Sequence, residues 1–373
     1  MRRLARAGNR VIFVNSISMG LPSLSNPELF PKIWRKLKSY AKLVRRTEEG
    51  LIVVSPFALP FYSKSWVRVL NRQLLLFQIK LLMMAFDLRR PILWIAIPTA
   101  REVAGRLDNS ALIYQVSDRY EANTMDHAIS GDVIEAMHRD LLERADLIYY
   151  SGRKLFEEDT SRFPAIRGRA KLLVHGVDYD HFAQATSVEW TIPDDIAQIP
   201  HPRLGYFGGI DSRLIDSDLI RFVSRKRPDW HWVLLGLKAS RLDIEELHNV
   251  HYLGSKPYLE LPRYSSTFDV CVLPWKVDDR WVSYGSAIKV REYLATGKPV
   301  VISPLYEYES LDGILRISRG YEDFIAKVDE VLRMDSDEQR AARQEAVRDG
   351  TWDARTEEVS RDITMIVNGR RGD

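Results

Sequence analysis

Cysteine is almost absent from this chain of 373 residues, which contains only Cys271. One cysteine excludes a disulfide framework and a cysteine-rich metal site, which fits a protein of the cytosol. The eight histidines are scattered, without a His-x-x-x-His pair, so we expect no metal and no other cofactor. A Gly-x-x-x-x-Gly-Lys-Ser/Thr phosphate loop is missing as well.

Long apolar runs are also missing. The apolar run at residues 11–14 is too short for the core of a signal peptide, so we expect no such leader. Residues 66–86 are largely apolar, but they include Arg68, Arg72 and Lys80. A span with three charges is a poor transmembrane segment, and we expect a helix of a globular domain there.

Acidic residues are scarce in the first hundred positions, which hold 17 Lys/Arg and 4 Asp/Glu, a net charge of +13. Residues 32–46, KIWRKLKSYAKLVRR, have apolar residues at helical spacing and no acid. This pattern is typical of a helix on an anionic membrane, where each basic residue contributes about 1 kcal/mol. The predicted membrane-facing residues are Lys32, Arg35, Lys36, Lys38, Lys42, Arg45 and Arg46.

Two other interpretations of this basic stretch are an ordinary amphipathic helix with a solvated face and a nucleic-acid surface. No zinc finger, RRM or other nucleic-acid module is present, so we expect no nucleic-acid partner. The solvated face of an ordinary helix seldom carries seven basic residues without any acidic residue. We therefore expect a cytoplasmic protein, peripheral on the inner face of the cell membrane.

Apolar strand patterns alternate with helical patterns along most of the chain, which predicts an α/β fold with parallel sheets. Strands are expected at 10–15, 51–55, 92–97, 111–116, 146–150, 171–174, 203–207, 230–235, 250–253, 268–273, 299–302 and 314–317. Helices are expected at 32–46, 66–86, 100–107, 132–144, 153–162, 217–226, 258–265, 287–296, 321–333 and 337–349. Three prolines without periodicity at 182–202 predict a linker.

Residues 286–301, SAIKVREYLATGKPVV, predict a helix that ends at Gly297 and leads into a buried strand. The start of such a helix lies at the carboxyl edge of a parallel sheet, where phosphate binds. Lys289 in its first turn would contact a nucleoside diphosphate and stabilise negative charge on its phosphates, worth roughly 3 kcal/mol. Glu292 would bind ribose hydroxyls. The alternative is a surface Lys289–Glu292 pair worth about 0.3 kcal/mol.

The same residues resemble the donor-binding signature of GT-B glycosyltransferases of bacterial surface polysaccharide synthesis, the family 4 and family 1-like enzymes of teichuronic acid and exopolysaccharide type. Further similarity lies at YFGGIDSR (206–213), HGVDYDHF (175–182) and YQVSD (114–118). The resemblance covers most of the chain. It implies two Rossmann-like domains facing an interdomain cleft and a metal-independent transfer from a nucleotide-sugar, with a lipid-linked saccharide as a common acceptor.

Four further residues are candidates for the donor site. Gly208 and Gly209 follow a strand and would let the backbone approach an anion. Arg213 could bind phosphate with its planar fork, although a tight turn with a solvated arginine is equally compatible with this segment. Tyr258 could stack on a nucleobase or pack in the core. The resemblance places His175 at the interdomain crossing, in contact with the sugar or fixing the hinge.

Asp118 follows the strand at 111–116 and is the candidate base that deprotonates the acceptor hydroxyl; the alternative is a turn cap. His127 is a second candidate base, whereas His138 is expected to be solvated. Retaining members of the resembled group carry a glutamate eight residues before Glu292, where this chain has Tyr284. We therefore expect an inverting transfer.

The expected domains are an acceptor- and membrane-side unit at 1–182, a linker at 183–202 and a donor-binding unit at 203–350. Residues 351–373 are expected to form a helix that packs back on the N-terminal domain. Residues 1–9 resemble the end of the helix that follows the first strand of such folds. Either this strand was lost or the chain start is internal, which translation of upstream DNA would test.

The sequence thus predicts a glycosyltransferase that moves a sugar from a nucleotide-sugar, in particular a UDP-sugar, to a lipid-linked or polysaccharide acceptor. Two alternatives are a non-catalytic scaffold subunit related to the transferases and a nucleotide-sugar epimerase. Tyr284 and the absent first strand favour the scaffold, whereas Lys289, Glu292 and the glycine turn oppose it. The basic face opposes the epimerase, whose soluble substrate needs no membrane.

Overall fold

The computed structural model describes residues 1–15, 44–59, 65–122 and 130–369. The chain divides into two compact units. The first contains Met1–Ser151, Leu155–Leu173 and Thr356–Asp373, and the second contains Gly152–Lys154 and Val174–Arg355. Among the described helices, none is long and apolar enough to cross a membrane.

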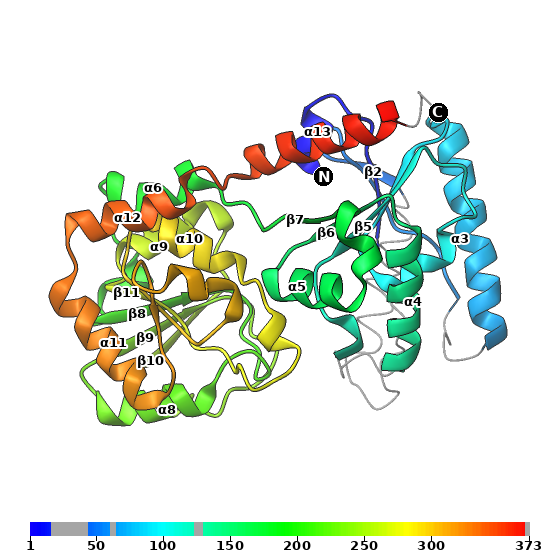
Figure 1. Cartoon of the computed structure of the whole chain (residues 1–373). Coiled ribbons are helices and arrows are strands. Elements are labelled where there is room, and N and C mark those ends of the chain that lie inside the picture. The colour runs from blue at the N-terminus through cyan, green and yellow to red at the C-terminus, as the bar shows by residue number, and fades with distance from the viewer. Residues whose placement is uncertain (16–43, 60–64, 123–129, 370–373) are drawn as a thin grey trace. The chain divides into compact units, whose positions relative to one another are not determined.

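The first unit is built on two small sheets (Figure 1). One has the order β1-β3-β2, and the other is a parallel sheet of order β4-β5-β6-β7. The strands are β1 (Ile12–Val14), β2 (Val44–Arg46), β3 (Ile52–Val54), β4 (Ile92–Ile95), β5 (Ala111–Val116), β6 (Leu147–Tyr150) and β7 (Ala170–Leu172). Five of these strands lie where apolar runs predicted them, and β7 overlaps its predicted range.

Helices of the first unit follow the predicted alternation. They are α1 (Arg2–Arg6), α3 (Ser65–Ala85), α4 (Gly131–Arg144), α5 (Arg153–Arg162) and α13 (Trp352–Gly369), with 3₁₀ turns η1 (Pro98–Val103), η2 (Tyr120–Ala122) and η3 (Pro164–Arg169). The C-terminal part of α13 packs in the first unit, where Val359 joins a cluster with Ile113 and Tyr149. The Tyr149 hydroxyl donates to Asp362 at 2.9 Å.

The predicted basic helix at 32–46 is wrong at its C-terminal end. Arg45 and Arg46 lie in strand β2, which pairs antiparallel with β3. The turn between these strands uses Gly50 at a φ of +85°, a conformation that glycine adopts without strain. Residues 44–46 pair with β3 across this turn, an interaction that the helical spacing of residues 32–46 does not reveal. Lys32, Arg35, Lys36, Lys38 and Lys42 lie outside the described residues.

The second unit contains one six-stranded parallel sheet of order β10-β9-β8-β11-β12-β13. The strands are β8 (Arg203–Phe207), β9 (His231–Leu235), β10 (Val250–Gly254), β11 (Val270–Leu273), β12 (Val300–Ile302) and β13 (Arg316–Ile317). The helices are α6 (Tyr179–Ser187), α7 (Asp194–Ala197), α8 (Ser217–Lys226), α9 (Leu261–Ser266), α10 (Ile288–Thr296), α11 (Tyr321–Met334) and α12 (Asp337–Arg348). Three 3₁₀ turns complete the unit, η4 (Tyr258–Glu260), η5 (Val282–Tyr284) and η6 (Tyr306–Leu311). Helices α9 and α10 lie on one side of the sheet and α8 on the other (Figure 1).

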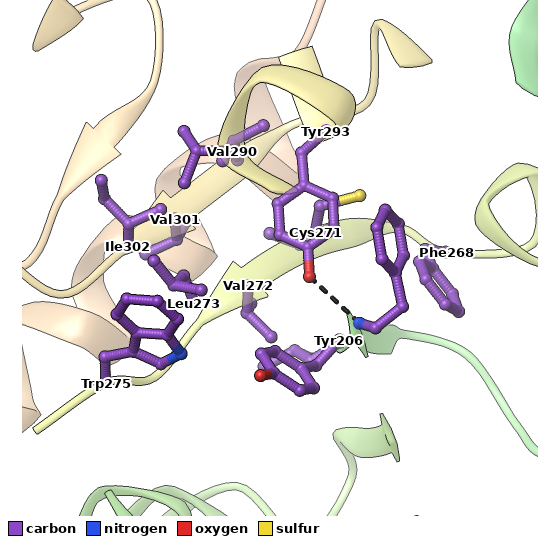
Figure 2. Close-up of a cluster of buried hydrophobic side chains, with 14 of the residues drawn as sticks. Tyr206, Phe268, Cys271, Val272, Leu273, Trp275, Val290, Tyr293, Val301 and Ile302 are labelled. Carbon is purple, nitrogen blue, oxygen red and sulfur yellow. Dashed lines mark hydrogen bonds between the residues drawn. The ribbon is translucent and has the colours of Figure 1, made fainter. Parts of the chain in front are cut away.

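Helix α10 is fixed to the sheet by a dense apolar core. Val290 and Tyr293 of this helix pack with Cys271 and Val301 of β11 and β12, all fully buried (Figure 2). The amide of Phe207, the last residue of β8, donates to the Tyr293 hydroxyl at 3.1 Å. This bond holds the end of β8 against α10 and therefore fixes the position of the residues that follow each element.

Two further predictions differ from the structure. The proposed linker at 183–202 belongs to the second unit and includes most of α6 and all of α7. Ala185, Ile196 and Ile199 are buried, whereas Val188 and Ile192 are exposed. The apolar residues of this range therefore show no single period. The helix predicted at 100–107 is a 3₁₀ turn at Pro98–Val103, which begins with Pro98.

Candidate functional site

Gly208 and Gly209 form the turn that follows β8 in the second unit. Gly208 has a φ of +144°, and a Cβ there would lie only 2.4 Å from Cε of Lys289. The Lys289 side chain therefore crosses directly over this glycine. The Tyr206 hydroxyl donates to the Gly209 carbonyl at 2.8 Å and holds the turn. Two segments that are 81 residues apart in sequence thus meet at the carboxyl edge of the sheet.

Gly208→Ala is expected to lower the thermal midpoint by a few degrees, because the positive φ and the contact with Lys289 together cost about 1–3 kcal/mol. Gly168→Ala is the control, because a Cβ there meets nothing within 4 Å and the backbone is not strained. The measurement is a thermal melt of both variants. An unchanged midpoint for Gly208→Ala would contradict this account of the turn.

Lys289 is half-buried on the first turn of α10. Its Nζ lies 4.7 Å from the ring centroid of Trp275 and 5.6 Å from that of Tyr206. No ion pair of Lys289 occurs within the described residues, so it does not form the surface pair with Glu292 that sequence allowed. Burial lowers the pKa of Lys289 to about 8, although the Glu292 carboxylate acts in the opposite direction. An anion bound at this ammonium would compensate for its lost hydration.

Glu292 is buried one turn further along α10. Burial raises the pKa of its carboxyl to about 7, while the Lys289 charge acts against this rise. The Tyr258 hydroxyl lies 3.0 Å from Asp178 and 3.5 Å from Glu292. A buried carboxyl with such a weak partner is suited to accept hydrogen bonds from a ligand.

The ring of Tyr258 packs on residues of α6 rather than in the core. It stacks on His181 with centroids 5.1 Å apart and is 43% exposed. Burial, and then the neighbouring carboxylates of Glu292 and Asp178, raise the pKa of Tyr258 well above its usual range. Its observed contacts position two carboxylates, and stacking on a nucleobase stays a prediction. Sequence reasoning missed Asp178 and His181, although both belong to the segment HGVDYDHF.

The N-terminus of α10 is open to an anion. Its N-cap residue, Ala287, makes no side-chain capping bond, so backbone N–H groups of the first turn remain available to a ligand. The parallel strands β8 and β11 end at this same edge. The glycine turn, the helix start and Lys289 therefore lie together in an arrangement that suits an anion, with the Glu292 carboxyl beside it.

Arg213 and His175 also lie in the second unit, but each has partners within the protein. The Arg213 guanidinium lies 3.8 Å from the Asp279 carboxylate and stacks over Trp281 at 5.3 Å. A phosphate would have to compete with this carboxylate, and the phosphate role stays a prediction. Burial and the Arg291 charge lower the pKa of His175, whose contact with a sugar also stays a prediction.

Asp118 belongs to the first unit, just beyond the carboxyl end of β5. Its side chain is half-buried, and burial raises the pKa of its carboxyl to about 6. A carboxylate with such a pKa holds its charge at neutral pH and can still accept a proton effectively. The alternative candidate base, His127, lies outside the described residues.

His138 is not solvated, contrary to the sequence prediction. It is buried, with Nδ1 2.8 Å from the Tyr114 hydroxyl and Nε2 2.9 Å from the Asp159 carboxylate. The other oxygen of Asp159 accepts from Arg119 at 2.8 Å. This network fixes Arg119, the residue that follows Asp118, and thereby the candidate base. Buried Ile134 and Leu141, at helical spacing from His138, were the missed signal.

Comparison with known proteins identifies the chemistry. A family model described as glycosyl transferases group 1 matches residues 206–334, the span that contains Gly208, Lys289 and Glu292. The chain is a glycosyltransferase with the GT-B fold. Teichuronic acid biosynthesis glycosyltransferase TuaH of Bacillus subtilis (strain 168) is 28% identical over 290 residues, which are 70% of this chain and 69% of TuaH.

Solved structures support the fold of this glycosyltransferase over nearly the whole chain. Sucrose-phosphate synthase from Thermosynechococcus elongatus aligns with a TM-score of 0.69 at 14% identity, covering 97% of this chain and 100% of that chain. Anabaena Alr3699/HepE, solved in complex with UDP and glucose, aligns with a TM-score of 0.61 at 13% identity, covering 95% and 99%. The comparisons favour the transferase interpretation over the scaffold and epimerase alternatives.

Proposed function

We propose that this glycosyltransferase moves a sugar from a UDP-sugar to a lipid-linked or polysaccharide acceptor at the cytosolic face of the membrane, with inversion at the anomeric carbon. The observation that carries the donor part is Lys289, a half-buried cation beside Gly208 that has no ion pair in the described parts of the chain. Its charge and the open N-terminus of α10 suit a diphosphate.

The donor would bind along α10. Lys289 and the first-turn N–H groups would hold the diphosphate, and Glu292 would accept hydrogen bonds from the two ribose hydroxyls. Tyr258, whose hydroxyl donates to Asp178 at 3.0 Å and lies 3.5 Å from Glu292, would keep these carboxylates in place. The choice of uracil as the base is supported by HepE, whose structure contains UDP.

In the proposed reaction, the acceptor hydroxyl oxygen attacks the anomeric carbon of the donor sugar. A new carbon–oxygen bond forms as the bond from this carbon to the phosphate oxygen breaks, and UDP departs with the bonding electrons. Asp118 takes the hydroxyl proton. Lys289 stabilises the negative charge on the leaving phosphate, a task that a metal ion performs in other transferases.

The acceptor part of the proposal rests on relatives and on charge. The name of TuaH places that protein in teichuronic acid biosynthesis, which supports a surface polysaccharide product here. The net charge of +13 in the first hundred residues supports work at an anionic surface. A lipid-linked saccharide would present its growing end at such a surface.

The test is a thermal shift of the full chain with UDP, GDP, dTDP, CMP and ADP. We expect UDP alone to raise the midpoint by several degrees, since ligand at 100 times its Kd adds about 2.7 kcal/mol. A shift with a different nucleotide would replace the proposed base. The absence of a shift with all five would overturn the proposed donor site.

A further inference from the structure

Helix α3 carries a row of large apolar side chains that the first unit leaves exposed. Trp66, Phe77 and Met84 are 62%, 60% and 70% exposed. The full row, here called the α3 stripe, is Trp66, Val69, Leu70, Phe77, Leu81 and Met84. Its spacing follows the 3.6-residue period, so the six side chains share one side of the helix. Single exposed apolar residues are ordinary, whereas six on one helix side mark an interaction surface.

Contacts on another side of α3 fix the stripe in its outward direction. Asn71 exchanges two hydrogen bonds with the backbone of Leu59, at 2.7 and 3.0 Å. Two turns later on the same face, Gln78 exchanges two hydrogen bonds with the backbone of Phe57, at 2.8 and 2.9 Å. Val67 is buried. The helix therefore cannot turn its apolar side inward without breaking these four bonds.

The charges on and around α3 indicate which partner covers the stripe. The helix has no acidic residue, and exposed Lys80 lies within the row. The first hundred residues of the sequence, which include this helix, carry a net charge of +13. Two copies of this surface would repel each other, whereas anionic head groups would attract it. Residues 66 to 84 span roughly 27 Å of helix, with a tryptophan at one end, the residue type favoured at membrane interfaces.

We propose that the α3 stripe is the surface by which this glycosyltransferase binds an anionic lipid bilayer. The helix lies in the plane of the interface, with its apolar side chains at the boundary between head groups and acyl chains and Lys80 at the phosphates. This inference deepens the proposed function and rests on it in one respect, that the acceptor is lipid-linked. It also adds a described helix to the membrane contact that is expected of the segment 32–46.

The experiment is co-sedimentation of the full chain with vesicles of phosphatidylcholine, alone or mixed with phosphatidylglycerol. The test variant is Phe77→Ser with Met84→Ser. The matched control is Met334→Ser with Met365→Ser, because these methionines are exposed to a similar degree on α11 and α13. We expect the wild type and the control to bind the mixed vesicles, and the stripe variant to bind roughly tenfold more weakly or worse. Added salt should weaken binding without abolishing it.

Three results would overturn the proposal. They are no binding by the wild type, equal binding by the stripe variant, or a wild-type dimer that the stripe substitutions convert to a monomer. The last would assign the surface to a second copy of the chain. The UDP thermal shift, measured on the same proteins, tests the proposed donor separately from the proposed membrane surface. A wild type that binds vesicles without responding to UDP would refute the donor and leave the stripe intact.

Discussion

Lys289→Ala is expected to lower kcat/KM by roughly 10²–10³-fold, the usual loss when one preorganised group that stabilises a leaving-group charge is removed. The UDP-induced thermal shift should disappear as well. The reason is that Lys289 lacks a carboxylate partner in the described residues and lies over Gly208, so its charge is available to a ligand. The measurements are steady-state rates and the thermal shift with UDP.

The control for this variant is Lys327→Ala. Lys327 pairs with Glu330 at 3.6 Å and i,i+3 spacing, the arrangement that sequence allowed as an alternative for Lys289 and Glu292. Its loss should leave rate and UDP binding unchanged. If Lys289→Ala behaved like this control, Lys289 would be an ordinary surface lysine and the diphosphate site would lie elsewhere.

The pH dependence of UDP binding gives an independent check on Lys289. Because burial lowers the pKa of this ammonium to about 8, the free protein loses the charge as the pH rises through this value. An anion binds the protonated form, so UDP affinity should fall as the pH rises above about 8. The Lys289→Ala variant should lack this dependence.

Asp118→Asn is expected to reduce kcat by roughly 10²–10⁴-fold, the range for removal of a general base. UDP binding should be unchanged, because Asp118 lies in the first unit and the proposed donor groups lie in the second. In the wild type, activity should decline as the pH falls through about 6, where the Asp118 carboxyl takes up its proton. Rate measurements across pH would test both statements.

Stability separates the catalytic effect of this variant from unfolding. The pKa of the Asp118 carboxyl is raised from 3.8 to about 6 by burial, so the folded state binds the proton more tightly than the unfolded state. Ionisation of Asp118 therefore costs stability, and this cost develops as the pH rises from about 4 to about 6. At neutral pH the asparagine variant should melt no lower than the wild type.

The matched control is Asp108→Asn, which changes an exposed carboxylate in a loop of the same unit. It should retain full activity. The stereochemistry of the product, determined by NMR, gives the second check on Asp118. An inverted anomer agrees with a base that activates the acceptor, whereas a retained anomer would remove the role proposed for this aspartate.

Much of the fold could be predicted because it depends on local patterns. Strands β8 and β11, and the helix α10 between β11 and β12, coincide with apolar runs and helix periods that the sequence displays. Prediction failed where contacts with other segments outweighed the local pattern. Val44–Arg46 has a helical pattern but pairs with β3, and the short helix α6 owes its place to packing on α9 and α10.

The sequence by itself determined the architecture and the residue types of the proposed donor site, including Gly208, Lys289 and Glu292, because apolar periodicity and motif spacing are local properties. Only the tertiary structure decided what these side chains touch. It separates Lys289 from a carboxylate partner, brings Asp178 to Tyr258, buries His138 and exposes the α3 stripe. Burial and pairing depend on segments far apart in the chain, so the pKa values and the exposed surfaces that produce function emerge only when the chain has folded.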